Sequence, residues 1–147
     1  MTTIHGDITH ITKGVIMHQV NCQNVMGAGV AKALYTVYPI VKQAYHAYCN
    51  RTPNARERLG YCQALRITDD LYIVNSFTQF DFGRKNICYT NMDLLKLNLT
   101  KASQFAQELG LPLYVPARIG CGLAGGDWSV LKPFIDRLEN VIIVDNQ

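Results

Sequence analysis

Residues 14–38 read GVIMHQVNCQNVMGAGVAKALYTVY, and their order of apolar and glycine residues indicates the fold class. Its first eight residues are mainly apolar and contain valine and isoleucine, which is typical of a buried β-strand. A short loop with two glycines follows. Residues 29–38 then have the apolar spacing of a helix, with one apolar face formed by Val30, Ala33, Leu34 and Val37. A strand, a tight loop and a helix in this order predict an α/β protein.

The same alternation continues on both sides of this stretch. Short apolar runs predict further strands at residues 2–5, 61–67, 71–77, 113–115 and 141–144. Helices are expected from Pro39 to about residue 49, from Asn91 or Thr90 as cap to about residue 109, and over residues 128–138. Gly110 suits the residue after the second of these helices. The pattern predicts a three-layer α/β/α fold around a mixed, largely parallel sheet.

Length and charge limit the classes of function. The 147 residues suit one domain over 1–147, and the net charge is only +3. No dense run of lysine and arginine occurs, which disfavours a nucleic-acid-binding module. Arginines 51, 56, 58 and 66 are interpreted as a solvated loop.

The five cysteines are odd in number and form no CxxC motif. The chain starts with polar residues, and no apolar run reaches the roughly 20 residues that span a bilayer. We therefore expect a cytoplasmic monomer with free thiols and no membrane contact. The histidines and cysteines lack metal-ligand spacing, so neither a metal nor a cofactor is expected.

Two glycine-containing loops follow predicted strands and precede predicted helices: residues 24–30 (NVMGAGV) and residues 118–128 (RIGCGLAGGDW). Glycine lets a backbone approach a ligand, and a helix N-terminus offers free N–H groups to an anion. The first loop could equally be a mere tight turn. It is neither a dinucleotide fingerprint nor a P-loop, because Lys32 stands where the third glycine belongs and no Gly-Lys-Ser/Thr follows.

The second loop contains a possible false match. Gly120, Gly122 and Gly125 fit the dinucleotide fingerprint, with Asp145 near the place of its acidic residue. Too few residues follow to complete that fold, so we do not expect a dehydrogenase.

Four pieces of sequence together resemble the macrodomain family: Gly6-Asp7-Ile8, Val20-Asn21-Cys22, MGAGVA at 26–31 and PARIGCGL at 116–123. Their order and spacing agree over nearly the whole chain. The chain is most similar to the branch that contains small ADP-ribose-1″-phosphate phosphatases and the hydrolases that remove ADP-ribose from glutamate.

The resemblance implies a role for each motif. Asp7 would accept a hydrogen bond from the adenine amino group, although by residue preference alone it would be a cap or turn residue. Asn21 would bind the distal ribose, and the two loops would clasp the diphosphate. The full implied ligand-binding set is Asp7, Ile8, Asn21, Gly27, Ala28, Gly29, Val30, Ser76, Ile119, Gly120, Cys121, Gly122, Leu123 and Ala124. Phe77, Phe80 and Phe82 either wall the site or pack in the core.

The chain departs from the glutamate-directed hydrolases at two catalytic positions. Thr78-Gln79 stands where that branch has a lysine, and Ala124 stands where it has an aspartate. Asn21 and Asp127 remain as candidate catalytic residues, although residue preference favours Asp127 as a helix cap. Cys121 is interpreted as a buried small residue. His18 is interpreted as a core histidine on the opposite face of its strand from Asn21.

The leading functional expectation is therefore metal-independent hydrolysis of ADP-ribose-1″-phosphate to ADP-ribose and phosphate. The alternatives are a non-catalytic reader of ADP-ribose, also on ADP-ribosylated macromolecules, or a de-ADP-ribosylating hydrolase without the usual lysine.

Overall fold

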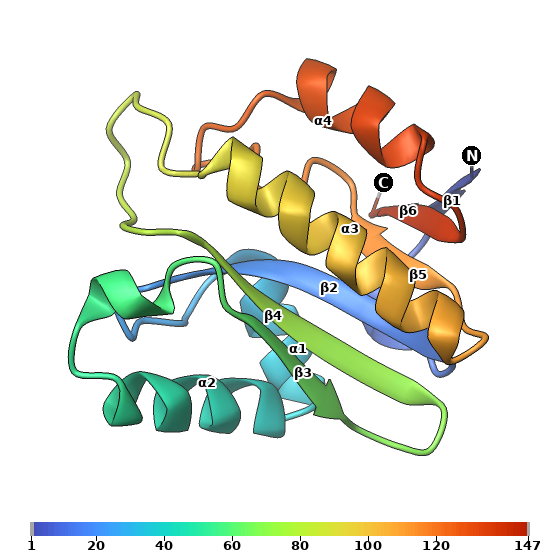
Figure 1. The fold of residues 1–147 in the computed structure, drawn as a ribbon, viewed down its shortest axis with the longest axis horizontal. Helices are drawn as coiled ribbons and strands as arrows, with labels where there is room; N and C mark the ends of the chain where they lie inside the picture. The colour runs from blue at the N-terminus through green and yellow to red at the C-terminus, as the bar shows by residue number, and fades with distance from the viewer. Residues whose placement is uncertain (1, 147) are drawn as a thin grey trace.

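The computed structural model describes residues 2–146 and contains a six-stranded sheet flanked by helices (Figure 1). The strands lie in the order β1-β6-β5-β2-β4-β3. All neighbours pair in parallel except β3 and β4, which form an antiparallel pair. Their bounds are β1 Thr2–His5, β2 Gly14–Asn21, β3 Cys62–Arg66, β4 Leu71–Gln79, β5 Leu113–Pro116 and β6 Val141–Asp145. The predicted mixed, largely parallel sheet is confirmed.

Two helices cover each face of the sheet, which gives the expected three layers (Figure 1). Helices α1 (Gly29–Val37) and α2 (Ile40–Arg51) pack through Leu34, Val41 and Tyr45 on one face. On the other face, α3 (Met92–Glu108) and α4 (Trp128–Asp136) contribute a second apolar cluster that includes Leu95, Leu99, Leu131 and Ile135. No helix within residues 2–146 is long and apolar enough to cross a membrane.

The two ends of α3 follow the local capping signals. The Asn91 side chain accepts a hydrogen bond from the Leu94 N–H at 3.0 Å and caps α3. After α3, Gly110 has φ +68°, the left-handed conformation that glycine adopts most readily. Pro39 is the residue before α2 rather than its first helical residue, a shift of one position from the prediction.

The loop of residues 52–60 is not uniformly solvated, and the prediction for Arg58 is wrong. Arg58 is buried, with 8% of its surface exposed, at the end of the 3-10 helix η2 (Ala55–Arg58). Its guanidinium donates to the backbone oxygens of Cys22, Cys49 and Thr52. A buried cation is tolerated here because its rigid fork of N–H donors meets several oxygens at once.

Strand β2 is irregular at its carboxyl end, where its register against β4 shifts between Val20 and Asn21. His18 contacts Asn75, whose amide reaches the Val41 carbonyl of α2. Asn21 contacts Tyr45, which also belongs to α2. The two side chains therefore lie on the same side of the sheet. The expectation of opposite faces is wrong because a bulge breaks the two-residue alternation.

Candidate functional site

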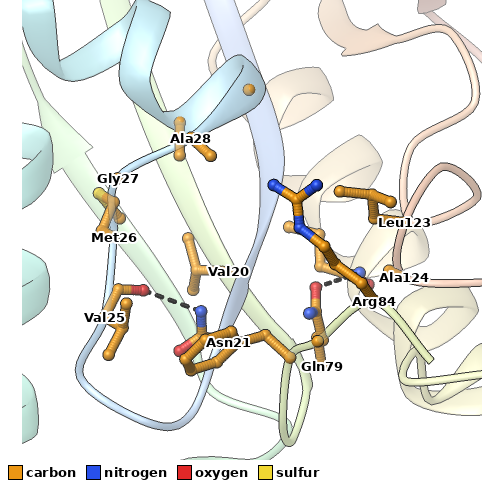
Figure 2. Close-up of a pocket in the computed structure, with 15 residues that line it drawn as sticks. Val20, Asn21, Val25, Met26, Gly27, Ala28, Gln79, Arg84, Leu123 and Ala124 are labelled. Atoms are coloured by element: carbon orange, nitrogen blue, oxygen red, sulfur yellow. Dashed lines mark hydrogen bonds between the residues drawn. The ribbon is translucent and has the colours of Figure 1, made fainter.

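A cavity of about 770 Å³ opens where β2 and β4 end, and it lies within the size range of small-molecule sites (Figure 2). It is walled by the loop before α1, the loop after β4 and part of the second glycine loop. Its lining residues are Gln19, Val20, Asn21, Val25, Met26, Gly27, Ala28, Gly29, Ala31, Gln79, Phe82, Gly83, Arg84, Leu123 and Ala124. The carboxyl ends of parallel strands are the usual place for a ligand in such sheets.

The first wall ends in the N-terminus of α1. Ala28 precedes the helix, and no side chain caps it. An uncapped helix start leaves backbone N–H groups and the positive end of the helix dipole available to an anion. A Cβ added to Gly27 would meet no atom within 4 Å, so packing does not explain the glycine there. A ligand that approaches the backbone would explain it.

Asn21 holds the first loop in shape. Its amide Nδ2 donates to the Val25 carbonyl at 2.8 Å (Figure 2). Its Oδ1 accepts from the Gln23 N–H at 2.9 Å. The buried Tyr45 hydroxyl accepts from the Val25 N–H at 3.0 Å. The same hydroxyl lies 2.9 Å from both the backbone oxygen and Oδ1 of Asn21 and donates to one of them. Asn21 and Tyr45 together fix the loop that forms this wall.

Helix α2 supports the same loop at further points. His46 Nδ1 lies 2.5 Å from the Asn24 side-chain oxygen, and Asn24 donates to Asn50 at 3.0 Å. Asn24 itself has φ +62°, an unusual conformation that these contacts hold in place. Arg58 adds a hydrogen bond of 2.6 Å to the Cys22 carbonyl. The first wall is therefore built by residues 45–58 as much as by its own sequence.

Packing explains most of the glycines in the second loop. Gly120 and Gly125 have φ +71° and +79°, and a Cβ on Gly126 would lie 2.5 Å from the Gly120 carbonyl. Gly122 is different, because a Cβ there would meet nothing within 4 Å. Within this loop, packing does not explain the small size of Gly122, and the approach of a ligand would explain it.

Polar side chains connect the floor of the cavity to the second loop. Gln19 donates to the Thr90 hydroxyl at 2.9 Å and to the Gln79 side-chain oxygen at 3.2 Å. Thr90 in turn donates to the Gly120 carbonyl at 2.7 Å. The carboxyl ends of β2 and β4 are thus joined to the loop after β5, so the walls of the cavity form one connected unit.

Several residues implied by the resemblance lie outside the cavity lining. The Asp7 carboxylate accepts from the N–H and the hydroxyl of Thr9, at 2.9 and 2.7 Å, and caps the 3-10 helix η1 (Ile8–His10). Asp127 caps α4 in the same way, accepting from the N–H and hydroxyl of Ser129 at 3.0 and 2.6 Å. Four of the remaining residues, Ile8, Ser76, Ile119 and Cys121, are buried or half-buried. Val30 and Gly122 are exposed and are next in sequence to the lining residues Gly29 and Leu123.

The lining is poor in groups that could transfer a proton. Among the lining residues, Arg84 is the only ionisable one. Burial raises the pKa of the Cys121 thiol to about 11, which leaves it protonated and a weak nucleophile. Within residues 2–146, no group of three His, Cys, Asp or Glu side chains is placed to hold a metal ion.

Comparison with known proteins connects this geometry to a fold family. The sequence matches no protein-family model. It is 24% identical to a macrodomain protein of Streptomyces coelicolor, whose structure superposes with a TM-score of 0.80 over 99% of this chain and 98% of that one. The chain has the macrodomain fold. A structure of Thermosipho africanus DarTG in complex with ADP-ribose is 20% identical, with a TM-score of 0.75 over 99% of this chain and 42% of that one.

Other relatives of this macrodomain are more similar in sequence. A protein of unknown function from Bacteroides thetaiotaomicron is 26% identical, with a TM-score of 0.86 over 99% of this chain and 97% of that one. An uncharacterized 17.5 kDa protein of Enterobacteria phage T4 is 28% identical over 97% of this chain and 94% of its own. An ADP-ribose 1″-phosphate phosphatase of Aspergillus fumigatus is 38% identical over 50 residues, a third of this chain and a quarter of that enzyme.

The cavity lining combines residues that the sequence analysis named with residues that it did not. The resemblance implies a lysine at Thr78-Gln79 and an aspartate at Ala124. Gln79 and Ala124 line the cavity of this macrodomain, whereas Thr78 is buried. Gln19 and Phe82 also line it, whereas Phe77 is fully buried and stacks on Tyr45. Gln19 lies two residues before Asn21 at the strand end, a signal that could have identified it. Nothing in the sequence pointed to Tyr45.

Proposed function

We propose that this macrodomain binds ADP-ribose, free or attached to another molecule, in the cavity between the two glycine-containing loops. The observation that carries the proposal is the uncapped N-terminus of α1, which lies on the cavity wall beside Gly27. Backbone N–H groups at such a terminus bind phosphate, and a glycine lets the phosphate come close. The complex of Thermosipho africanus DarTG with ADP-ribose supports the choice of ligand.

The rest of the lining suits the sugar and base of such a ligand. Val20, Met26 and Phe82 provide apolar and aromatic surface, while the amides of Gln19 and Gln79 both donate and accept hydrogen bonds. Hydroxyl groups of a ribose need partners of this kind. Asp7 stays in the proposal as a contact for the adenine, although its carboxylate already accepts from Thr9 in the absence of ligand.

Calorimetry with ADP-ribose and with NAD tests the binding. We expect ADP-ribose to bind, and NAD to bind at least about tenfold more weakly because a nicotinamide would crowd the distal end of the cavity. A variant of an exposed residue far from the cavity, Arg66→Gln, serves as the control and should bind as the parent does. Absence of ADP-ribose binding, or equal affinity for NAD, would contradict the proposal.

A second candidate function is hydrolysis of ADP-ribose-1″-phosphate, favoured by the 50-residue match to the fungal phosphatases. With Arg84 as its only ionisable group, the cavity offers no carboxylate, imidazole or thiol as a base. Hydrolysis would therefore depend on a positioned water and on stabilisation of charge by backbone N–H groups and Arg84.

Phosphate release from ADP-ribose-1″-phosphate, with and without a chelator, tests this second function. We expect activity that does not depend on added metal and that falls about 10²-fold in Asn21→Ala, through lost positioning. Binding of ADP-ribose without any phosphate release would leave the protein a non-catalytic reader.

A further inference from the structure

Arg84 is the one charged side chain in the lining of the cavity. It belongs to the loop of residues 80–89 that follows β4. In Figure 2 it lies on the side of Gln79, Ala124 and Leu123, across the cavity from Met26 and Gly27. Its guanidinium points into the space between these two sides. The charge therefore belongs to the wall opposite the first glycine loop.

The loop that carries Arg84 is built to a definite shape. A Cβ on the neighbouring Gly83 would collide with the Tyr89 hydroxyl, so the Tyr89 side chain reaches back to the middle of the loop. The backbone N–H groups of Tyr89 and Thr90 donate to the Ala124 carbonyl at 2.6 and 3.1 Å. These contacts join the Arg84 loop to the second glycine loop.

Arg84 has no acidic partner in the described part of the chain. The three salt bridges among residues 2–146 involve His10, Arg66 and Lys132, each with an aspartate on its own segment. The cavity lining contains no carboxylate. A guanidinium without a partner, beside apolar surface, is well suited to bind a planar or tetrahedral anion through two parallel hydrogen bonds.

In the proposed binding mode, the diphosphate of ADP-ribose lies on the other wall, at the N-terminus of α1. We propose that Arg84 binds a second anionic group, a phosphate monoester carried on the ADP-ribose, and so makes the cavity selective for phosphorylated ADP-ribose. This inference rests on the proposed function and assigns the specificity to one side chain. The group that Arg84 would recognise is a phosphate monoester dianion. ADP-ribose-1″-phosphate carries this group and serves as the probe.

The test compares the affinities of two ligands in three proteins. The ligands are ADP-ribose and ADP-ribose-1″-phosphate, and the proteins are the parent chain, Arg84→Gln and Lys85→Gln. Lys85 is exposed, adjacent to Arg84 and outside the cavity lining, so its variant has the same change in net charge. If phosphate is released during the titration, KM from initial rates replaces Kd for the phosphorylated ligand.

We expect the parent protein to prefer the phosphorylated ligand by at least about tenfold, the range of a charge-assisted bidentate contact. Arg84→Gln should remove this preference and change the Kd of ADP-ribose less than about threefold, whereas Lys85→Gln should keep the preference. An equal loss for both ligands would place the guanidinium on the diphosphate and overturn the inference. Absence of any preference in the parent would also overturn it, while binding of ADP-ribose in that case would leave the proposed function intact.

Discussion

Tyr45 contributes to the cavity through a single oxygen atom. Its hydroxyl is buried and forms hydrogen bonds with Asn21 and Val25, and its ring stacks on Phe77. The ring belongs to the core, whereas the hydroxyl belongs to the loop. The two roles can be separated because phenylalanine keeps the ring and removes only the oxygen.

We predict that Tyr45→Phe lowers the free energy of unfolding by about 1–2 kcal/mol and weakens ADP-ribose binding about fivefold. The Val25 N–H loses its acceptor, and the loop must be ordered when the ligand binds. Chemical denaturation and calorimetry measure the two effects. The matched control is Tyr72→Phe, whose ring packs on Phe105 away from the cavity. Unchanged binding in Tyr45→Phe would show that the hydroxyl is not needed to position the loop.

His18 is a neutral histidine of the core. Asn75 donates through its amide to Val41 and Gln63, so its oxygen faces His18 and accepts from the His18 Nε2–H at 2.6 Å. His18 Nδ1 is buried and has no hydrogen-bond partner in the described residues. Burial lowers the pKa of His18 to about 4, because the charged form would lose its hydration.

This lowered pKa predicts a pH dependence of stability. Between the ordinary histidine pKa, about 6.5, and the folded value, the unfolded chain binds the proton that the folded chain excludes. Stability is therefore complete above pH 6.5 and falls as the pH decreases towards 4, by up to about 3 kcal/mol. Denaturation at pH 7.5 and 5.0 should show a smaller loss in His18→Gln, which keeps a donor for Asn75 but does not titrate. Equal losses in both proteins would exclude His18 as the cause.

Within one structural element, the second glycine loop, two positions require glycine for different physical reasons. Gly126 is small because the Gly120 carbonyl lies against it, whereas the place of a side chain on Gly122 is open. A substitution at Gly122 should therefore affect ligand binding, whereas one at Gly126 should affect stability. We predict that Gly122→Glu keeps the parent thermal stability and abolishes ADP-ribose binding, because a carboxylate would repel the diphosphate.

In contrast, Gly126→Ala should lower the free energy of unfolding by about 1–3 kcal/mol through overpacking. Thermal melting and calorimetry on both variants test the pair. Binding retained in folded Gly122→Glu would place the ligand elsewhere on the molecule.

Helix α4 depends on Asp127 at its start. Its carboxylate accepts from the Ser129 N–H and hydroxyl and does not line the cavity. We therefore expect Asp127→Ala to cost about 1 kcal/mol of stability and Asp127→Asn to cost little, since asparagine is an equally good cap. Phosphate release measured on the same variants tests whether the Asp127 carboxylate also takes part in hydrolysis. Loss of activity in the stable Asp127→Asn variant would show that the carboxylate takes part in the chemistry.

At the scale of the whole molecule, the cavity joins segments that follow three different strands. The loops after β2, β4 and β5 all contribute to its lining, and Gln19 and Thr90 connect them. A ligand that contacts all three loops requires the folded chain. It should therefore stabilise the protein against global unfolding.

We predict that ADP-ribose at 100 times its Kd raises the free energy of unfolding by about 2.7 kcal/mol, or the Tm by roughly 5–10 °C. NAD at the same concentration should give a smaller shift. Gly122→Glu is the matched control and should show no shift. A rise in Tm that is the same in Gly122→Glu would indicate binding outside the cavity.

Local signals in the sequence predict the elements and the class of the fold. Apolar periodicity, the caps at Asn91 and Asp127, and Gly110 predicted helices and strands close to their observed bounds. These signals are local, because a cap or an apolar face is defined by residues within one or two turns of each other. The two glycine loops were also visible in the sequence, since strand–loop–helix order sets their place at the carboxyl end of the sheet.

The construction of the site depends instead on contacts between segments that are distant in the sequence. Arg58 is buried because the carbonyls of Cys22, Cys49 and Thr52 converge on it, and the sequence gives no indication of that convergence. The hydrogen bond between Gln19 and Thr90 joins residues 71 positions apart. Likewise, whether a position in the second glycine loop must be glycine depends on which distant atom lies against it. Such contacts depend on the path of the packed chain, because burial and hydrogen-bond partners are properties of the folded surroundings rather than of the residue.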